Sequence, residues 1–331
     1  MARNLSENGD IVNALYSATS ALGIKLEDYC LNLGLPKALL HSPEQFSSSH
    51  LYGYLLDSIA TEFHCHDLSL HIAEALHAPR LGFPANLLSY SSTFHDGLDE
   101  ANRYKIFYHD IGHWHWHPVG EQVSLQKRCE EAAKCFHQRN LFGTAQMFLH
   151  LQLLANNLWR PSKVYFSFES PNGLILDKFH RFFNCELVFK HEFDAVAFDR
   201  KYLSFSIANS DPTKLRYALQ QLNAMQQALF KNKTFLERTA ILMAQRLRFS
   251  DCTAQNIAED MELSIEEFSN QLAVNACSFK ELHEQQLLQR LHTYVVDWKV
   301  PPELAANALL PKNKSLQTIL LGKLSAQSKS D

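Results

Sequence analysis

The chain has 331 residues, of which 46% are apolar and 20% charged, and its formal net charge is −4 with neutral histidines. This length and composition are typical of a globular protein with about two domains, and they exclude a strongly basic protein. No run of about 18 apolar residues predicts a membrane span, the N-terminus lacks the apolar core of a signal peptide, and the seven cysteines are scattered without a CxxC pair. We therefore expect a cytoplasmic protein without a membrane partner.

Helical spacing of apolar residues dominates the first part of the chain. A Gly-Leu-Pro sequence at 34–36 predicts the end of one helix, and the serines at 47–49 predict the start of another. The helices expected in this part cover 11–22, 26–33, 51–63, 68–76 and 95–103.

Strand patterns begin near residue 104, where aromatic and β-branched residues become frequent. The expected strands cover 104–112, 119–127, 164–169, 187–189 and 195–198. Helices are expected over 130–157, with a break near Gly143, and over 174–183. The first part of the chain is therefore predicted to be an α+β domain, with helices followed by a small, mainly antiparallel sheet.

A boundary is predicted at Asn209–Pro212, which has the composition of a turn and a helix start. The polar helix expected over 214–230 would connect two domains and could also join two copies of the chain. The predicted division is an α+β domain at 1–208, a connecting helix at 209–232 and an all-α domain at 233–331.

The segment from Thr253 to Phe279 has the pattern of two short helices joined by a tight turn. Ser264 and Glu267 have the spacing of a capping box at the start of the second helix. The apolar faces of the two helices would consist of Ile257, Ala258 and Met261, and of Ile265, Phe268 and Leu272. Spacing alone is equally compatible with a helix-turn-helix, whose second helix lies in the DNA major groove, and with an ordinary helical hairpin.

The same segment resembles the first helix-turn-helix of AraC-type regulators. The matching positions, in the family's order and offsets, are Ile257, Ala258, Met261, Leu263, Ser264, Phe268, Leu272, Ser278 and Phe279. Glu266 and Asn270 stand where the family usually has arginine, and Ala276 stands where it tends to have glycine. Farther along, a linking helix through Arg290 and Tyr294 and an eroded second helix-turn-helix at 301–324 also resemble the family.

Residues 1 to about 205 resemble the ligand-sensing, arabinose-binding-like domain found on a branch of the same family. The matching pieces are Gly34–Pro36, Leu81–Gly82, Ser91–Phe94, Arg103–Tyr104, Pro161, Val164, Phe166, Phe182–Phe183 and Phe189. The resemblance implies a small organic effector, and the candidate binding residues are Arg103, Tyr104, His113 and His115. Arg103 could hold an acidic group by a bidentate contact, or it could have the structural role of a helix cap or a partner for Glu100.

Charge argues against strong DNA binding. Residues 233–331 contain eleven lysines and arginines against twelve acidic residues, a net charge of −1, whereas DNA-binding surfaces are usually basic. The candidate DNA-binding residues are Ser264, Glu266, Glu267, Asn270, Gln271, Lys280, Lys312 and Lys314. A local basic stripe could also include Arg246, Arg248 and Lys323.

The sequence at 113–117 alternates histidine and tryptophan, so that a strand would place His113, His115 and His117 on one face. Three imidazoles could begin a metal site, but no further ligand stands at a reliable offset. We therefore predict that these histidines bind no metal, and that the stretch is an exposed strand end or a wall of the effector pocket. No phosphate loop, nucleophile elbow or HExxH motif occurs, so we expect no enzyme activity, no catalytic residue and no cofactor.

The sequence thus favours a cytoplasmic AraC-like transcription regulator that senses a small organic effector and binds DNA weakly. A first alternative is a divergent member that has lost DNA reading and acts as a sensor or protein-interaction partner. A second alternative is a metal-dependent enzyme that uses the His113–His117 strand.

Overall fold

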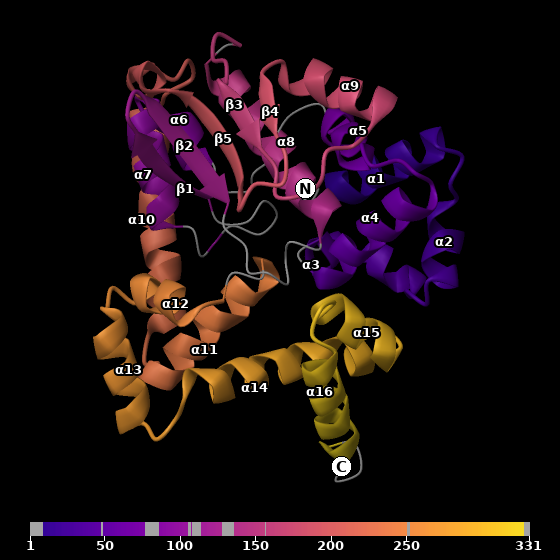
Figure 1. Ribbon diagram of the computed structural model, residues 1–331. Coiled ribbons are helices and arrows are strands. Elements are labelled where there is room, and N and C mark those ends of the chain that lie inside the picture. The colour runs from indigo at the N-terminus through magenta and orange to yellow at the C-terminus, as the bar shows by residue number, and fades with distance from the viewer. Residues whose placement is uncertain are drawn as a thin grey trace, which may run out of the picture. The chain divides into compact units, whose positions relative to one another are not determined.

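The computed structural model describes residues 9–47, 49–76, 86–104, 107, 114–127, 136–155, 157–249 and 252–327. The chain forms two compact units, which are described separately (Figure 1). The N-terminal unit draws its residues from 1–24, 52–128 and 136–228. The C-terminal unit contains residues from 25–51 and 229–331.

The N-terminal unit begins with helices, as the apolar spacing predicts. Its helices before the sheet are α1 (Gly9–Ala21), α4 (His50–Glu62), α5 (Leu68–Ala75), α6 (Asn86–Tyr90) and α7 (Phe94–Arg103). The hydroxyl of Thr93 accepts a hydrogen bond from the backbone N–H of Asp96 and so caps α7.

A five-stranded sheet follows, with the order β1-β2-β5-β3-β4. Its strands are β1 (Trp114–Val119), β2 (Gln122–Lys127), β3 (Lys163–Tyr165), β4 (Glu186–Val188) and β5 (Asp194–Asp199). Three of the strand pairs are antiparallel, and β3 pairs with β4 in parallel. The expectation of a small, mainly antiparallel sheet is confirmed.

The first hairpin differs from the prediction. The strand expected at 104–112 falls mostly outside the described residues, and Tyr104 itself is the C-cap of α7. The partner of β2 is instead β1, which includes the alternating His-Trp stretch and continues through Pro118. A proline is compatible with this position because β1 is an edge strand. The outer side of an edge strand has no neighbouring strand, so its backbone N–H groups need no partner in the sheet.

Helix α8 (His137–Leu154) runs without interruption through Gly143, where the sequence predicts a break. It packs against both α5 and β5, and most of its side chains are buried. Burial on several sides offsets the low helix propensity of glycine, which explains why the predicted break at Gly143 is wrong.

An aromatic core lies between α8, the sheet and α9 (Gly173–Phe183). Phe179 and Phe183 of α9 are fully buried, and the rings of Phe166 and Phe183 are 5.5 Å apart in an edge-to-face arrangement. The helical spacing of Phe179, Phe182 and Phe183 predicts a core role, which is confirmed for Phe179 and Phe183, whereas Phe182 is half-buried. Edge-to-face pairs of this kind stabilise a core beyond the area they bury.

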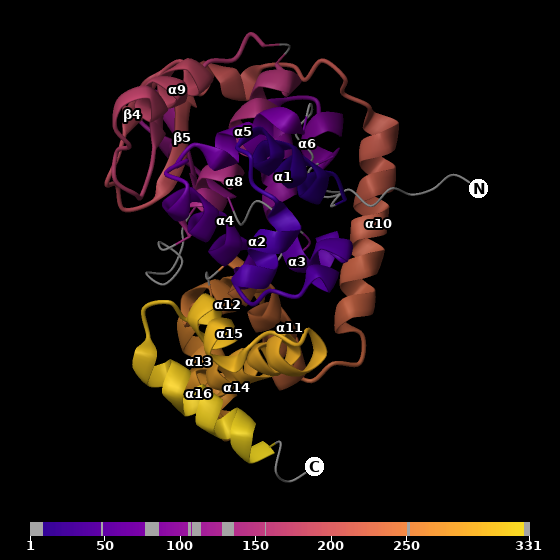
Figure 2. The same cartoon turned by 90° about the vertical axis from the view of Figure 1, so that its right-hand side faces the viewer.

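Helix α10 (Pro212–Phe230) runs along one side of this unit (Figure 2). Ala218 and Leu222 of α10 are buried in a cluster with Leu87 and Tyr104. The rest of the helix surface is largely exposed, including Tyr217 and Met225. A short 3-10 helix, η5 (Arg200–Ser204), precedes it.

The C-terminal unit is wholly helical in the residues that the structure describes. Its later elements are α11 (Phe235–Arg246), η6 (Leu247–Phe249), α12 (Ala254–Asp260), α13 (Ile265–Val274), α14 (Phe279–His292), the π-helical turn η7 (Thr293–Asp297), α15 (Pro302–Leu309) and α16 (Lys314–Gln327). No helix among the described residues is long and apolar enough to cross a membrane.

An early segment of the chain also belongs to the C-terminal unit, which a division in sequence order at residue 208 does not anticipate. Lys25–Leu51 carries α2 (Leu26–Asn32), η1 (Lys37–His41) and α3 (Pro43–Ser47). The buried hydroxyl of Tyr294 accepts a hydrogen bond from the backbone N–H of His50 at 3.2 Å. Gly34 has a left-handed backbone, and a Cβ there would approach Pro301 to 3.3 Å, so glycine suits this close packing.

Candidate functional site

Helices α12 and α13 form the pair that the sequence predicts (Figure 1). Thr253 caps α12 by accepting a hydrogen bond from the backbone N–H of Asn256. In the turn between the helices Glu262 has a left-handed backbone, with φ of 58°. The predicted apolar faces are confirmed in part. Ile257 and Ala258 are fully buried and Phe268 and Leu272 are 0% and 5% exposed, whereas Ile265, which was expected on the same face, is 41% exposed.

The capping box at the start of α13 is also confirmed. The carboxylate of Glu267 accepts hydrogen bonds from the backbone N–H and hydroxyl of Ser264, at 2.9 and 2.7 Å. In return the Ser264 hydroxyl accepts from the backbone N–H of Glu267 at 3.2 Å. These hydrogen bonds hold the pKa of Glu267 below its usual range, so both residues are occupied in starting the helix.

Three of the other candidate DNA-binding residues lie on the solvent side of α13. Glu266, Asn270 and Gln271 are exposed, and α13 contains no basic residue. Asparagine and glutamine can pair with adenine edges in a major groove, and glutamate can accept from cytosine. The exposed surface of α13 therefore has groups that could read bases but no positive charge for phosphates.

The basic stripe considered from the sequence is reduced in the structure. Arg246 is buried, with its Nε and Nη2 at 2.7 and 2.8 Å from the two carboxylate oxygens of Asp260. Lys323 Nζ lies 2.9 Å from Glu284. Arg246 therefore joins α11 to α12 and is not a surface cation. The sequence did not predict this, because helical spacing alone does not show that this face of α11 is covered.

The remaining candidate lysines are on the surface. Lys280, Lys312 and Lys314 are exposed, and Lys314 Nζ donates to the side-chain oxygens of Asn307 and Gln317 at 3.1 and 3.3 Å. Lys280 and Lys312 could contact phosphate groups directly, whereas Lys314 would first have to leave the side-chain oxygen of the buried Gln317.

The candidate effector residues Arg103 and Tyr104 occupy the end of α7. Arg103 is exposed and pairs with Glu100 at 3.2 Å, which is the structural role considered from the sequence. Tyr104 is 2% exposed, and its hydroxyl donates to Asn223 Oδ1 on α10 at 2.7 Å. Tyr104 thereby fastens α10 to the rest of the N-terminal unit.

His115 lies on β1, directly opposite Gln126, and His117 lies opposite Ser124. Residues that face each other in a sheet point to the same side, so the two histidines share one face with Ser124 and Gln126. The third histidine, His113, lies outside the described residues. Within the described part of the chain, no three His, Cys, Asp or Glu side chains are placed to hold a metal ion together.

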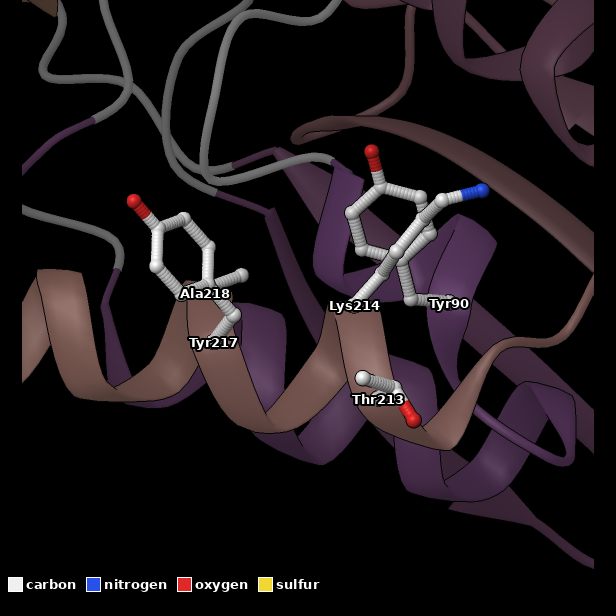
Figure 3. A pocket seen from close by; sticks show the side chains of 5 residues that line it. All are labelled: Tyr90, Thr213, Lys214, Tyr217 and Ala218. Carbon is white, nitrogen blue, oxygen red and sulfur yellow. The ribbon is translucent and has the colours of Figure 1, made fainter.

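A shallow hollow of about 400 Å³ lies between α6 and α10. Tyr90 comes from α6, and Thr213, Lys214, Tyr217 and Ala218 come from α10 (Figure 3). The ammonium of Lys214 lies 5.8 Å from the Tyr90 ring centre and 3.2 Å from Asp211. The hollow therefore presents aromatic surface beside a cation that is already paired.

Sequence reasoning missed the polar side chains inside the N-terminal unit. Gln146 and His150, one turn apart on α8, are 1% and 5% exposed. Burial lowers the pKa of His150 to about 4. The sequence signal for this pair was the i, i+4 spacing of two polar residues, which places them on one face of α8.

The side chain of Asp57, on α4, contacts the first turn of α8. Its Oδ1 accepts a hydrogen bond from the backbone N–H of Gln138 at 2.9 Å. The residue as a whole is half-buried, but Oδ2 is inaccessible to solvent and has no partner among the described residues. Burial raises the Asp57 pKa from 3.8 to about 7, although hydrogen bonds from the backbone of Gln138 and His137 act to lower it.

The raised pKa of Asp57 predicts a pH dependence of stability. An unfolded chain loses this proton near pH 3.8, whereas the folded protein keeps it until about pH 7. Stability should therefore fall as the pH rises through this window, since the folded state binds more protons. Asp57→Asn keeps the oxygen acceptor without the charge, so its Tm should fall less between pH 5 and pH 8 than that of the unaltered protein. Asp177→Asn, an exposed site on α9, is the control, and equal pH profiles for all three proteins would contradict the assignment.

The N-terminal part of the chain matches a known protein family. Residues 23–206 match the family model described as the arabinose-binding domain of AraC transcription regulators, N-terminal. A solved structure, that of the transcriptional regulator CdpR from Pseudomonas aeruginosa, is 13% identical with a TM-score of 0.41 and covers 99% of this chain and 100% of that chain. No curated protein sequence matches.

The matched region covers more than half of the chain and defines a class of transcription regulators with an N-terminal sensing domain. The chain belongs to this AraC-type family. The match supports the α+β fold of the N-terminal part, whereas the region of α12 and α13 lies beyond it.

Proposed function

We propose that the chain regulates transcription by binding a small organic effector within residues 1–208 and by contacting DNA weakly through α12 and α13. The observation that carries the proposal is the family match over residues 23–206, together with a capped helix pair downstream of it. The helix at 209–232 would connect the two functions, and a cytoplasmic location follows from access to DNA.

Weak DNA binding is proposed because the exposed side of α13 has no cation. Release of counterions from phosphates supplies much of the affinity of proteins for DNA, and residues 233–331 carry a net charge of −1. Asn270 and Gln271 would supply base contacts, whereas Lys280, Lys312 and Lys314 would supply the few phosphate contacts. The carboxylate of Glu266 would weaken both kinds of contact, because it repels the DNA phosphates.

The effector acts, in this proposal, by binding one arrangement of the protein better than another, because only a difference in affinity shifts an equilibrium. A homodimer belongs to the same proposal. The exposed side of α10, with Tyr217 at 61% and Met225 at 47% exposure, offers apolar contacts for a second copy, and equilibrium sedimentation measures this association.

The deciding experiment titrates the unaltered protein against labelled duplexes from around its own gene at several salt concentrations. Measurable binding that weakens steeply with salt supports the proposal. Complete absence of binding at low salt would favour the alternative of a family member that acts through protein partners. The exposed Ile265 and Val274 of α13 would then be the first surface to test by co-purification.

A further inference from the structure

Helix α8 carries six buried polar or charged side chains, and most of them have partners. The Gln138 amide accepts from the backbone N–H of Ser69 at 3.0 Å and donates to the His66 carbonyl at 2.8 Å. Asn140 accepts from Lys127 Nζ at 3.1 Å. These side chains face α5 and the sheet, and their hydrogen bonds satisfy them.

Gln146 and His150 are different. Neither amide atom of Gln146 and neither ring nitrogen of His150 has a hydrogen-bond partner in the described part of the chain, and all four atoms are shielded from solvent. A buried polar group without a partner costs free energy, and native proteins keep few of them. Two such residues on adjacent turns of one helix point to a partner that is not part of the chain.

The positions on α8 form one continuous row. Arg139, Gly143, Gln146 and His150 follow each other at intervals of four, three and four residues, the spacing that aligns side chains on one face of a helix. Arg139 is also buried, at 6% exposure. Gly143 contributes no side chain to this row, and its presence in the middle of a long helix is unfavourable unless a close approach requires it.

The two unpartnered side chains define the chemistry of what they can bind. Burial holds the His150 pKa at about 4, so the imidazole is neutral at pH 7 and has one donor and one acceptor. The Gln146 amide likewise donates and accepts without charge. A bound carboxylate would lose its hydration here without gaining an opposite charge from either residue. Arg139 lies about two helical turns from Gln146 and already has an interaction of its own.

We propose that Gln146 and His150 bind the effector, and that the effector is an uncharged small molecule whose hydroxyl or amide groups both donate and accept hydrogen bonds. This inference rests on the proposed sensing function of residues 1–208 and deepens it. The hydroxyl or amide groups of the effector take the place of the missing partners of the two side chains.

A first test needs no ligand. Gln146→Met and His150→Phe replace the polar groups by apolar groups of similar size, which removes the unsatisfied atoms. If the side chains serve binding rather than folding, each variant melts at the same temperature as the unaltered protein or higher by roughly 2–4 °C. A fall in Tm of that size or more in both variants would assign a structural role to the pair and overturn the proposal.

A second test uses defined probes and thermal unfolding of the full chain. The neutral probes are D-xylose, D-glucose, myo-inositol and nicotinamide, and the charged counterpart is gluconate. At least one neutral probe at millimolar concentration is expected to raise the Tm by a few degrees, since a ligand stabilises the state that binds it. Gluconate should have no comparable effect.

The response must depend on the two residues. It should be lost in Gln146→Met and His150→Phe and kept in Gln152→Met, a matched change at a half-buried position of the same helix. A response that survives in the first two variants, a stronger response to gluconate, or no response to any neutral probe overturns the proposal. Because neither test involves DNA, their failure is distinguishable from failure of the regulator function.

Discussion

Arg246→Met is expected to destabilise the C-terminal unit by about 3–5 kcal/mol. The guanidinium of Arg246 and the carboxylate of Asp260 are both 1% exposed, and two hydrogen bonds of 2.7 and 2.8 Å join them. Methionine fills much of the same volume but leaves the buried carboxylate of Asp260 without the guanidinium that balances its charge. The cost arises mainly from that charge, because the pair itself gains little over well-packed apolar residues.

Native-state hydrogen exchange of the α12 and α13 backbone measures the effect where it should occur. In Arg246→Met the amides of Ile257 and Phe268 should exchange faster by several orders of magnitude. The double variant Arg246→Met with Asp260→Leu should recover most of the protection. Arg238→Met, at an exposed position of the same helix, is the control. Unchanged exchange in Arg246→Met would show that other contacts hold α12 against α11.

The second large effect is expected in DNA binding. Arginine at positions 266 and 270, where AraC-type sequences usually have it, should strengthen non-specific duplex binding on the order of 10- to 100-fold near 0.1 M salt. Each new phosphate contact should also steepen the dependence of log K on log salt by about 0.9. Glu267 is left unchanged because its carboxylate closes the capping box with Ser264, and a lysine there would weaken the start of α13.

The comparison requires a control for net charge. Asp177→Arg makes the same charge change as Glu266→Arg, but on α9 of the N-terminal unit. Titrations of a labelled duplex at several salt concentrations should show a gain for Glu266→Arg alone, a larger gain when Asn270→Arg is added, and little for Asp177→Arg. Equal gains would mean that overall charge, rather than the surface of α13, governs the affinity. Tight, sequence-specific binding by the unaltered protein would show that the electrostatic objection is wrong.

Local patterns in the sequence predicted local structure well. The helix expected at 174–183 is found at Gly173–Phe183, and the strand expected at 195–198 is found at Asp194–Asp199. The capping box of Ser264 and Glu267 is found with both of its hydrogen bonds. These features depend on residues within a few positions of each other, so a short stretch of sequence contains the information that specifies them.

Features that depend on distant partners could not be predicted in this way. An arginine such as Arg246 is expected at the surface, and only its pairing with Asp260 in another helix makes it a core residue. Gly143 indicates a helix break until burial of α8 on several sides outweighs propensity. For Gln146 and His150 the sequence shows two polar residues, whereas their burial without partners is a property of the folded unit.

The C-terminal unit is assembled from pieces far apart in the chain, which has a consequence for how the protein folds during synthesis. Lys25–Leu51 leaves the ribosome early, but its partners in α14 and beyond, such as Tyr294, are made only after the whole N-terminal unit. Chains generally fold domain by domain from the N-terminus, and contacts between distant segments form late. The residues of this segment that meet late partners, such as Gly34 and His50, therefore stay without them while some 200 further residues are translated. In this period a chaperone or an early contact with the nascent N-terminal unit would protect the segment from aggregation.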